Sequence, residues 1–335
     1  MPSLERGSHR IVIAGASSLL GTELRALLEE SRFAGAEFRL VDEETAAGQL
    51  TEVGGEPAVI QPVEDGTFDR AAKIFFCGSA EFTRANLGAA RASSAKIIDL
   101  SGESAENDAA VCWFPKLDSL VARKFPAEGT LFAVPSAAGT AAASLALGLF
   151  KIGVSRLVFM SFQPVSDAGR AGIEELESQT GQLLSFQGMG QPVFDTQVAF
   201  NLLDRFGTNS KLKLSAVREH LRAETKACIG KKSIMPALQL IHAPVFYGTA
   251  FSACAELVPG ATVEQITSAC EDAGFSVPAD GESGPSNVSV AGEKVAHLAN
   301  PEEDPARPGA WWFWGAADNI RLPAANAVKL AEMLP

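Results

Sequence analysis

The feature that most constrains the fold is a glycine-containing turn near the N-terminus, between a predicted strand and a predicted helix. Residues 10–14 form the short apolar run RIVIA, which is typical of a buried strand, and Gly15 and Gly21 lie in the turn that follows. Glycines in this context let backbone N–H groups at the start of a helix approach a dinucleotide pyrophosphate. Because Ser18 takes the position of the usual middle glycine, the turn also fits a strand–helix connection that binds no ligand.

The apolar runs that follow predict two kinds of sheet. Up to about residue 136, short buried strands alternate with helices, which favours a doubly wound α/β domain with a parallel sheet. Beyond it, a long strand and two partly exposed strands indicate a second, more open sheet, and residues 215–227 alternate in charge as an exposed helix would. The predicted strands are 10–14, 38–41, 73–77, 96–99, 131–135, 155–164, 239–245 and 249–258, and the predicted helices include 139–150, 169–180 and 324–334. We expect a Rossmann-like domain over residues 1–136 and 312–335 and an inserted α+β domain with a mixed sheet over 137–311.

Composition excludes several classes of partner. The net charge of -12 repels phosphate backbones, so nucleic acid is not expected to bind. No apolar run reaches the roughly 18 to 20 residues of a membrane span, and Met1 to His9 lacks a signal-peptide core. The five cysteines are scattered, odd in number and without a CxxC pair. We therefore expect a cytoplasmic protein with reduced thiols and no metal site.

An acidic cluster bears on the choice of cofactor. Asp42 ends the second predicted strand, where a carboxylate would accept hydrogen bonds from a ribose hydroxyl. Glu43 and Glu44 follow it, and carboxylates here would repel a 2′-phosphate, so NAD is favoured over NADP. The same residues also fit a solvated acidic loop, which leaves open that no cofactor binds. The predicted cofactor-binding residues are Gly15, Ser17, Ser18, Leu19, Leu20, Gly21, Asp42, Gly78 and Asn326.

Short motifs run in order over nearly the whole chain. They are GASSLLGTEL from Gly15, IDLS from Ile98, SFQPVS from Ser161, AGRAGIEEL from Ala168, VAFN from Val198, Glu224-Thr225, APVF from Ala243, DNIR from Asp318 and AANAV from Ala324. As a set they resemble the aspartate-semialdehyde dehydrogenase family. The resemblance implies a Rossmann-like domain with an inserted dimerisation domain, and a homodimer.

The resemblance also implies a reaction that this chain is not equipped to perform. The family uses a cysteine nucleophile, a histidine acid/base and arginines that hold anionic substrate groups. Ala137 stands at the cysteine, Thr249 at the histidine and His242 at an arginine, while Gln163 is retained. Ala105 is the closest match to the second arginine. We expect a divergent member without the family's activity.

Other residues offer little replacement for the missing groups. Ser136 is adjacent to the nucleophile position, but a strand-to-helix turn aims neighbouring side chains differently, and Cys77 at a strand end is more typical of a core residue. His242 fits a satisfied sheet histidine better than a catalytic base. Two functions stay open: a binding or structural homodimer that takes a small-molecule ligand, or an NAD(P)-dependent oxidoreductase acting on the aldehyde or oxo group of a different small substrate.

Overall fold

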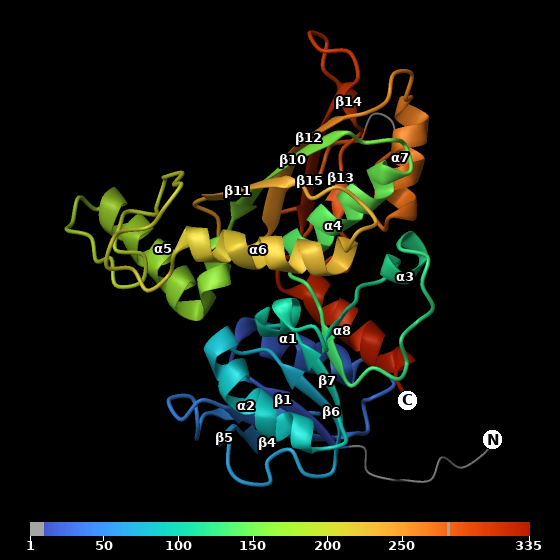
Figure 1. Ribbon diagram of the computed structural model, residues 1–335. Coiled ribbons are helices and arrows are strands. Elements are labelled where there is room, and N and C mark those ends of the chain that lie inside the picture. Colours follow the sequence, from blue (N-terminus) through green and yellow to red (C-terminus); the bar gives the residue numbers. More distant parts are fainter. Residues whose placement is uncertain (1–9, 280–281) are drawn as a thin grey trace. The chain divides into compact units, whose positions relative to one another are not determined.

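The computed structural model describes residues 10–279 and 282–335, which form two compact units (Figure 1). Unit 1 comprises the chain up to Cys112, Pro126–Val134 and Ala324–Pro335, and unit 2 comprises Trp113–Phe125 and Pro135–Pro323. The segment Met1 to His9, for which we expect no signal peptide, and residues 280–281 lie outside the described residues.

Unit 1 contains a seven-stranded parallel sheet with the strand order β5-β2-β1-β6-β7-β9-β8. The order reverses next to β1, as in a doubly wound fold, so the predicted Rossmann-like architecture is confirmed. The central strands are continuous apolar runs because helices cover both of their faces. The strands are β1 (Arg10–Ala14), β2 (Glu37–Asp42), β5 (Gln61–Pro62), β6 (Ala71–Phe76), β7 (Lys96–Asp99), β8 (Val111–Cys112) and β9 (Leu131–Ala133).

Helices α1 (Leu19–Glu29) and α2 (Ala80–Ala92) follow β1 and β6 in unit 1. Each begins with a serine N-cap, Ser18 and Ser79, whose hydroxyl accepts a hydrogen bond from a backbone N–H three residues later. A short hairpin, β3 (Leu50–Val53) and β4 (Glu56–Val59), and the 3-10 turn η1 (Glu103–Glu106) complete the regular elements of this unit. The core between the helices and the sheet is apolar and includes Val12, Ile74 and Phe76.

The last helix, α8 (Arg321–Met333), passes into unit 1 at Ala324 and is held there at its C-terminal end. Lys73 Nζ donates a hydrogen bond of 3.0 Å to the carbonyl oxygen of Pro335. Arg32 donates to the carbonyl oxygens of Ala331 and Leu334 at 3.2 and 3.3 Å. Two cations therefore bind the carbonyl end of the helix, where the helix dipole favours positive charge.

Unit 2 is built on a mixed sheet with the order β11-β10-β12-β15-β13, in which β14 also pairs with β15. Only β10 and β11 are parallel among its described strands. The strands are β10 (Arg156–Gln163), β11 (Ala237–His242), β12 (Thr249–Glu256), β13 (His297–Leu298), β14 (Glu302–Glu303) and β15 (Ala310–Ala317), and the helices are α3 (Leu117–Leu120), α4 (Ala137–Phe150), α5 (Gly169–Leu184), α6 (Leu214–Ile229) and α7 (Val263–Asp272), with the 3-10 turn η2 (Val165–Ala168). The predicted mixed sheet is confirmed.

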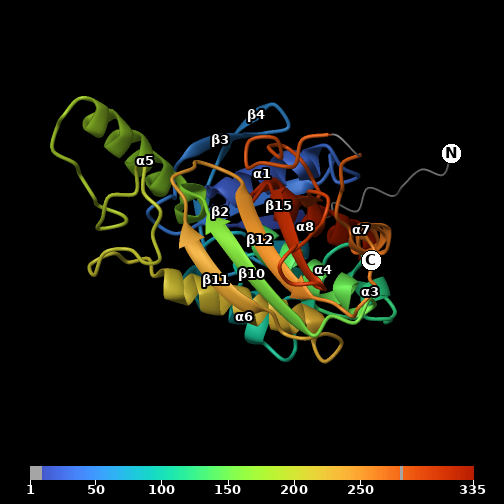
Figure 2. The same cartoon turned by 90° about the horizontal axis from the view of Figure 1, so that it is seen from above.

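The mixed sheet is covered by helices on one face only. Helices α4, α6 and α7 lie on the same side of it in Figure 1, and the view in Figure 2 looks onto the other face. Phe159, Phe251 and Phe313 are fully buried on the covered face, whereas Trp312 and Trp314 on the open face are 48% and 41% exposed. The open face is therefore apolar as well as accessible.

Two expectations need correction. Residues from 312 onward were expected in the first domain, but β15 pairs with β12 over eight residue pairs and lies in unit 2. An apolar run alone does not specify which sheet a strand joins. Reduced thiols were expected throughout, but Cys112 and Cys228 each take part in a disulfide, which the spacing of the cysteines in the sequence does not reveal.

Two further observations concern the described part of the chain. No helix there combines the length and apolar character that crossing a bilayer requires. No group of three or more histidine, cysteine, aspartate or glutamate side chains within those ranges is arranged to hold a metal ion.

Candidate functional site

The turn after β1 is built for close backbone approach. Gly15 has φ of 88°, and a Cβ added to it would lie 2.1 Å from the backbone nitrogen of Gly78, in the turn after β6. Gly21 is similarly confined, because a Cβ there would lie 2.4 Å from the carbonyl oxygen of Gly15. The Ser18 hydroxyl is 2.8 and 2.9 Å from the carbonyl oxygens of Gly15 and Cys77, so it joins the two turns. Ser18, a predicted cofactor-binding residue, thus stabilises the turn through its hydroxyl, at the position where the usual motif has a glycine.

The first backbone N–H groups of α1 lie directly after this turn. Leu19 and Leu20 begin the helix, and the first N–H groups of a helix have no intrahelical partner. Those N–H groups and the helix dipole suit a negatively charged group.

Asp42 anchors the acidic loop beside this turn. Its carboxylate accepts hydrogen bonds from the backbone nitrogens of Ser17 at 2.7 Å and Glu43 at 2.8 Å. The Glu43 carboxylate accepts a hydrogen bond of 3.2 Å from the hydroxyl of Ser79, the N-cap of α2. The two acidic side chains therefore lie at the carboxyl ends of β1, β2 and β6, where the fold would place a nucleotide.

Asn326 is the remaining predicted cofactor residue of unit 1. It lies on α8 with only 3% of its surface exposed, and its Nδ2 atom has no hydrogen-bond partner among the described residues. An unsatisfied buried amide is costly unless another group completes it. Together with the confined glycines, this orphan donor fits a dinucleotide bound by unit 1.

In unit 2, the predicted nucleophile position lies at the first residue of α4. Ala137 is 2% exposed and has no reactive atom. The N-cap before it, Ser136, donates to the Glu224 carboxylate of α6 from its hydroxyl at 2.6 Å and from its backbone nitrogen at 3.1 Å. A Cβ at Gly139 would lie 2.5 Å from Glu224 Oε2, so this glycine leaves room for the carboxylate. An internal anion thus occupies the positive end of α4.

Gln163, the retained family residue, ends β10 and contacts an acidic side chain. Its Nε2 donates to Asp167, whose other oxygen accepts a 2.6 Å hydrogen bond from Asn319 Nδ2. The same Asn319 amide contacts the Ser166 hydroxyl at 3.0 Å and accepts from the Gly248 nitrogen at 2.9 Å. Asp167 as a whole is an exposed residue, yet packed groups surround its carboxylate, and desolvation raises its pKa to about 6 against the lowering effect of the Asn319 and Gln163 amides.

His242 ends β11 and is directly opposite Gln163 in the parallel β10–β11 register. Its side chain is 1% exposed and its ring lies 5.7 and 5.4 Å from the rings of Phe194 and Phe206. Burial lowers the pKa of His242 to about 4, and a hydrogen bond with the Val198 backbone acts in the opposite direction. Its Nε2 has no partner among the described residues. A neutral imidazole between two phenyl rings cannot bind a carboxylate as arginine does.

Thr249 and Ala105 belong to different units of the chain. Thr249 is the first residue of β12, 3% exposed, next to Ala250, which pairs with Phe162 beside Gln163. Ala105 belongs to the turn η1 of unit 1, where the nearby Arg84 is paired with Glu103 at 2.6 Å. The structure therefore brings Gln163, His242 and Thr249 together on adjacent strands, and supplies no arginine from the η1 segment.

No free cysteine replaces the missing nucleophile. Burial raises the pKa of Cys77 well above its usual range, with Asp99 and Asp42 adding to the effect, and raises the pKa of Cys270 to about 12. Partial burial also raises the pKa of Cys254. A reactive cysteine needs a lowered pKa, so all three behave as packing residues near neutral pH.

Two residues of this region received no role from the sequence, although both lie in motifs that carry the family resemblance. Glu224 binds the start of α4, and Asn319 joins η2, Gly248 and Asp167. A buried glutamate on a helix and an asparagine after an apolar strand were the available signals, but their partners are far away in sequence.

Comparison with known proteins agrees with this architecture. Residues 10–124 match the NAD-binding domain of semialdehyde dehydrogenase, and residues 147–322 match the semialdehyde dehydrogenase dimerisation domain. A USG-1 protein homolog from Pseudomonas aeruginosa is 29% identical over 97% of both chains, and the aspartate-semialdehyde dehydrogenase of Rickettsia bellii is 24% identical over the same share of each. A solved structure of a probable aspartate-semialdehyde dehydrogenase from Pseudomonas aeruginosa superposes with a TM-score of 0.86 at 27% identity, covering 97% of both chains. With both domain models matched in order, the chain belongs to the semialdehyde dehydrogenase family.

Proposed function

We propose that this chain is a non-catalytic member of the family, a binding or structural homodimer without semialdehyde dehydrogenase activity. The observation that carries the proposal is Ala137 at the first residue of α4, the position of the family's nucleophile. A thioester intermediate needs a thiolate, and removal of the nucleophile removes this pathway. Thr249 offers no acid/base group near neutral pH, and general acid–base help is worth about 10²- to 10⁴-fold in rate.

The surroundings of Ala137 also bear on the proposal. The Glu224 carboxylate at the start of α4 belongs to a motif shared with the family, so it does not distinguish this chain from catalytic members. The retained Gln163 amide, in contrast, donates to the Asp167 carboxylate and is therefore already engaged within the protein.

The test compares the native protein with Ala137→Cys in the reduction of acyl phosphates and the oxidation of aspartate semialdehyde. We expect no enzyme-like rate from either, because the base and the anion-binding groups are still missing in the variant. Activity in the native protein, or full activity from the single cysteine, contradicts the proposal.

A dinucleotide, where one binds, is proposed to be NAD rather than NADP. The confined glycines, the start of α1 and the orphan amide of Asn326 fit such a ligand, which when bound would supply hydride transfer. Asp42 and Glu43 are fixed beside the turn, and their charges repel a 2′-phosphate by on the order of 1 kcal/mol. Calorimetry with both dinucleotides tests this preference, and tighter NADP binding refutes it.

The same measurement addresses the second candidate function, an NAD(P)-dependent oxidoreductase on a different small substrate. The first N–H groups of α1, which lack intrahelical partners, and the unpartnered buried amide of Asn326 favour it. Saturable NAD binding would support this second candidate. If NAD does not bind, the binding or structural homodimer is the candidate that remains.

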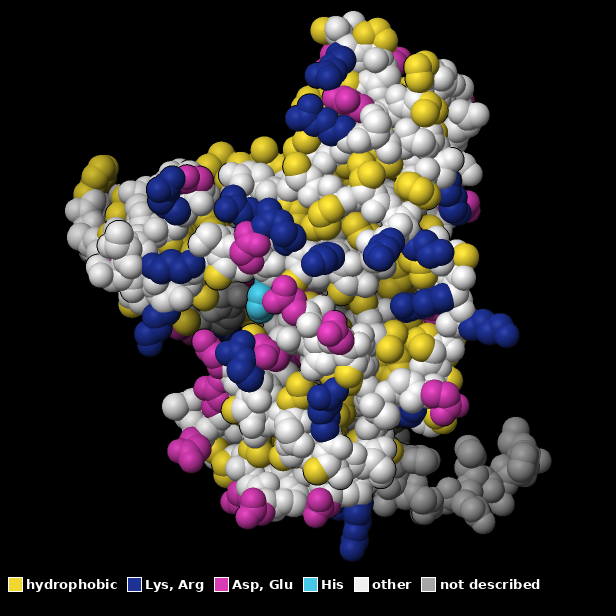
Figure 3. Space-filling model, in the orientation of Figure 1, with side chains coloured by type: hydrophobic (Ala, Val, Ile, Leu, Met, Phe, Trp, Pro, Cys, Tyr) yellow, Lys and Arg dark blue, Asp and Glu magenta, His cyan; other side chains and the backbone are white. Residues whose placement is uncertain are grey.

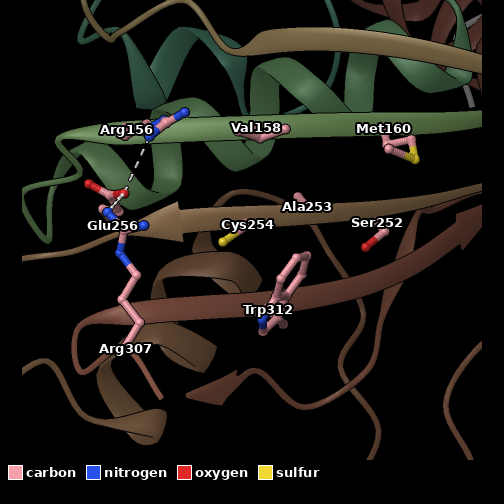
Figure 4. Close-up of a pocket in the computed structure, with 9 residues that line it drawn as sticks. All are labelled: Arg156, Val158, Met160, Ser252, Ala253, Cys254, Glu256, Arg307 and Trp312. Carbon is pink, nitrogen blue, oxygen red and sulfur yellow. Dashed lines mark ion pairs between the residues drawn. The ribbon is translucent and has the colours of Figure 1, made fainter. Parts of the chain in front are cut away.

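The homodimer is proposed to form through the open face of the mixed sheet. This face belongs to the matched dimerisation domain, and a groove of about 280 Å³ runs across it (Figure 4). Glu256 pairs with Arg307 at 2.7 Å and with Arg156 at 3.7 Å at one end of the groove, and Trp312 lies along it. The lining residues are Arg156, Val158, Met160, Ser252, Ala253, Cys254, Glu256, Arg307 and Trp312.

Light scattering tests the dimer at micromolar concentration. We expect twice the chain mass for the native protein and about one chain mass for Trp312→Glu. The matched control is Phe150→Glu, which replaces a comparably exposed aromatic at the end of α4, away from the open face. A native protein of one chain mass, or equal dissociation in both variants, contradicts this interface.

A further inference from the structure

A band of basic side chains crosses unit 2 over α6, on a protein whose net charge is -12 (Figure 3). Residues 211–232 contain seven lysines and arginines but only two glutamates. We call the seven the basic ridge: Lys211, Lys213, Arg218, Arg222, Lys226, Lys231 and Lys232. Such a concentration on an acidic chain creates a local positive potential that the composition conceals.

One of the two glutamates is turned away from this surface. Glu224 is 7% exposed and binds Ser136, whereas Glu219 stays exposed and forms an ion pair with Arg222. Lys226, Lys231 and Lys232 are exposed, and no ion pair involves them among the described residues. The net charge that this segment presents to solvent is therefore positive.

The cations are arranged in a line. Arg218, Arg222 and Lys226 are four residues apart along α6, so their side chains lie about 6 Å apart along one edge of the helix. Helix α6 is about 24 Å long, and exposed lysines lie just before and just after it in the chain.

We propose that the basic ridge binds an acidic helical segment of a partner protein, with carboxylates at i, i+4 spacing opposite the cations of α6. Two other polyanions fit the surface less well. Residues 211–232 include no phenylalanine, tyrosine or tryptophan on which nucleic-acid bases could stack. None of the exposed large apolar side chains lies in this range either, so the ridge has no anchor for insertion into a lipid surface.

The test uses two fluorescent 21-residue peptides of glutamate, alanine and leucine. In one, the glutamates occupy a single helical face at i, i+4 spacing; in the other, the same residues are scrambled. Fluorescence anisotropy at low salt should give at least threefold tighter binding for the ordered peptide, and binding should disappear in 0.5 M NaCl because salt screens exposed charges.

Charge-reversal variants locate the site. Lys226→Glu/Lys231→Glu/Lys232→Glu should weaken binding at least tenfold. The matched control, Lys151→Glu/Lys294→Glu/Lys329→Glu, changes the net charge equally at exposed lysines elsewhere and should retain native affinity, with thermal melting confirming that both variants fold.

Four outcomes overturn the proposal. They are no binding of the ordered peptide, equal binding of both peptides, an equal loss in both triple variants, and tighter binding of a single-stranded 20-mer oligonucleotide or of phosphatidylserine vesicles than of the ordered peptide. The proposal does not depend on whether the protein is catalytic.

Discussion

Acidification should unfold this protein partly through His242. The side chain is 1% exposed between Phe194 and Phe206, and its pKa in the folded state is about 4. An unfolded histidine has a pKa of about 6.5. Between these two pH values His242 is protonated in the unfolded chain but not in the folded chain. Its contribution to the free energy of unfolding is therefore complete above about pH 6.5 and falls as the pH is lowered towards 4.

The size of the effect follows from the two pKa values. A difference of about 2.5 pKa units corresponds to about 3 kcal/mol at about 1.4 kcal/mol per unit. This is a large share of the 5–15 kcal/mol that typically stabilises a folded domain. Asp167 acts in the opposite direction over a similar range, because its raised pKa of about 6 means that the folded state binds the extra proton. The pH dependence of the free energy of unfolding of the native protein therefore contains the opposing contributions of His242 and Asp167.

The difference between the native protein and His242→Gln isolates the histidine. Urea unfolding at pH 7, 5.5 and 4.5 should show the native protein losing about 2 kcal/mol more than the variant between pH 7 and 4.5, since the full difference is reached only below about pH 4. Glutamine keeps a polar side chain without a titrating ring. The control is His220→Gln on the exposed side of α6, which should keep the native pH dependence. A constant offset between native and His242→Gln curves at all three pH values would refute the reasoning.

Three further predictions rest on single contacts. Gly15→Ala should abolish any NAD binding seen by calorimetry and lower the unfolding temperature, because the new Cβ would lie 2.1 Å from Gly78; unchanged binding would show that the turn is not so confined. Burial lowers the pKa of Lys73 to about 8, so the native protein should gain stability in urea between about pH 8 and 10.5, and Lys73→Met should lose that gain. Thr262→Ala removes the N-cap of α7, where Thr262 and Gln265 form a capping box, and should cost about 1 kcal/mol in urea unfolding, with a cost near zero contradicting the cap's role.

The parallel sheet was predictable because its strands are buried on both faces and so form continuous apolar runs. Strand β15 was not predicted; its run AWWFWGAA is apolar on both the covered and the open face of the mixed sheet. Helix α7 was not predicted either, although the capping-box pair Thr262 and Gln265 marks its start, because few large apolar residues recur along the helix.

At the candidate site, resemblance supplied the positions but not the contacts. Ala137, Gln163, His242 and Thr249 could be placed by motif alone. The bond from Ser136 to Glu224 spans 88 residues, and that from Asn319 to Asp167 spans 152. Such pairs depend on how helices and strands pack, so local patterns carry no information about them.

The division of the chain into units has a consequence for how the protein is made. Unit 1 begins with β1 but is completed only by Ala324–Pro335, and the mixed sheet of unit 2 waits for β15 at Ala310–Ala317. On the ribosome, unit 2 can therefore not finish folding before β15 has been made, nor unit 1 before Ala324–Pro335. Until then the nascent chain exposes apolar sheet faces, which makes it prone to aggregation. A stalled or prematurely ended product should be cleared by proteolysis instead of surviving as a folded first domain.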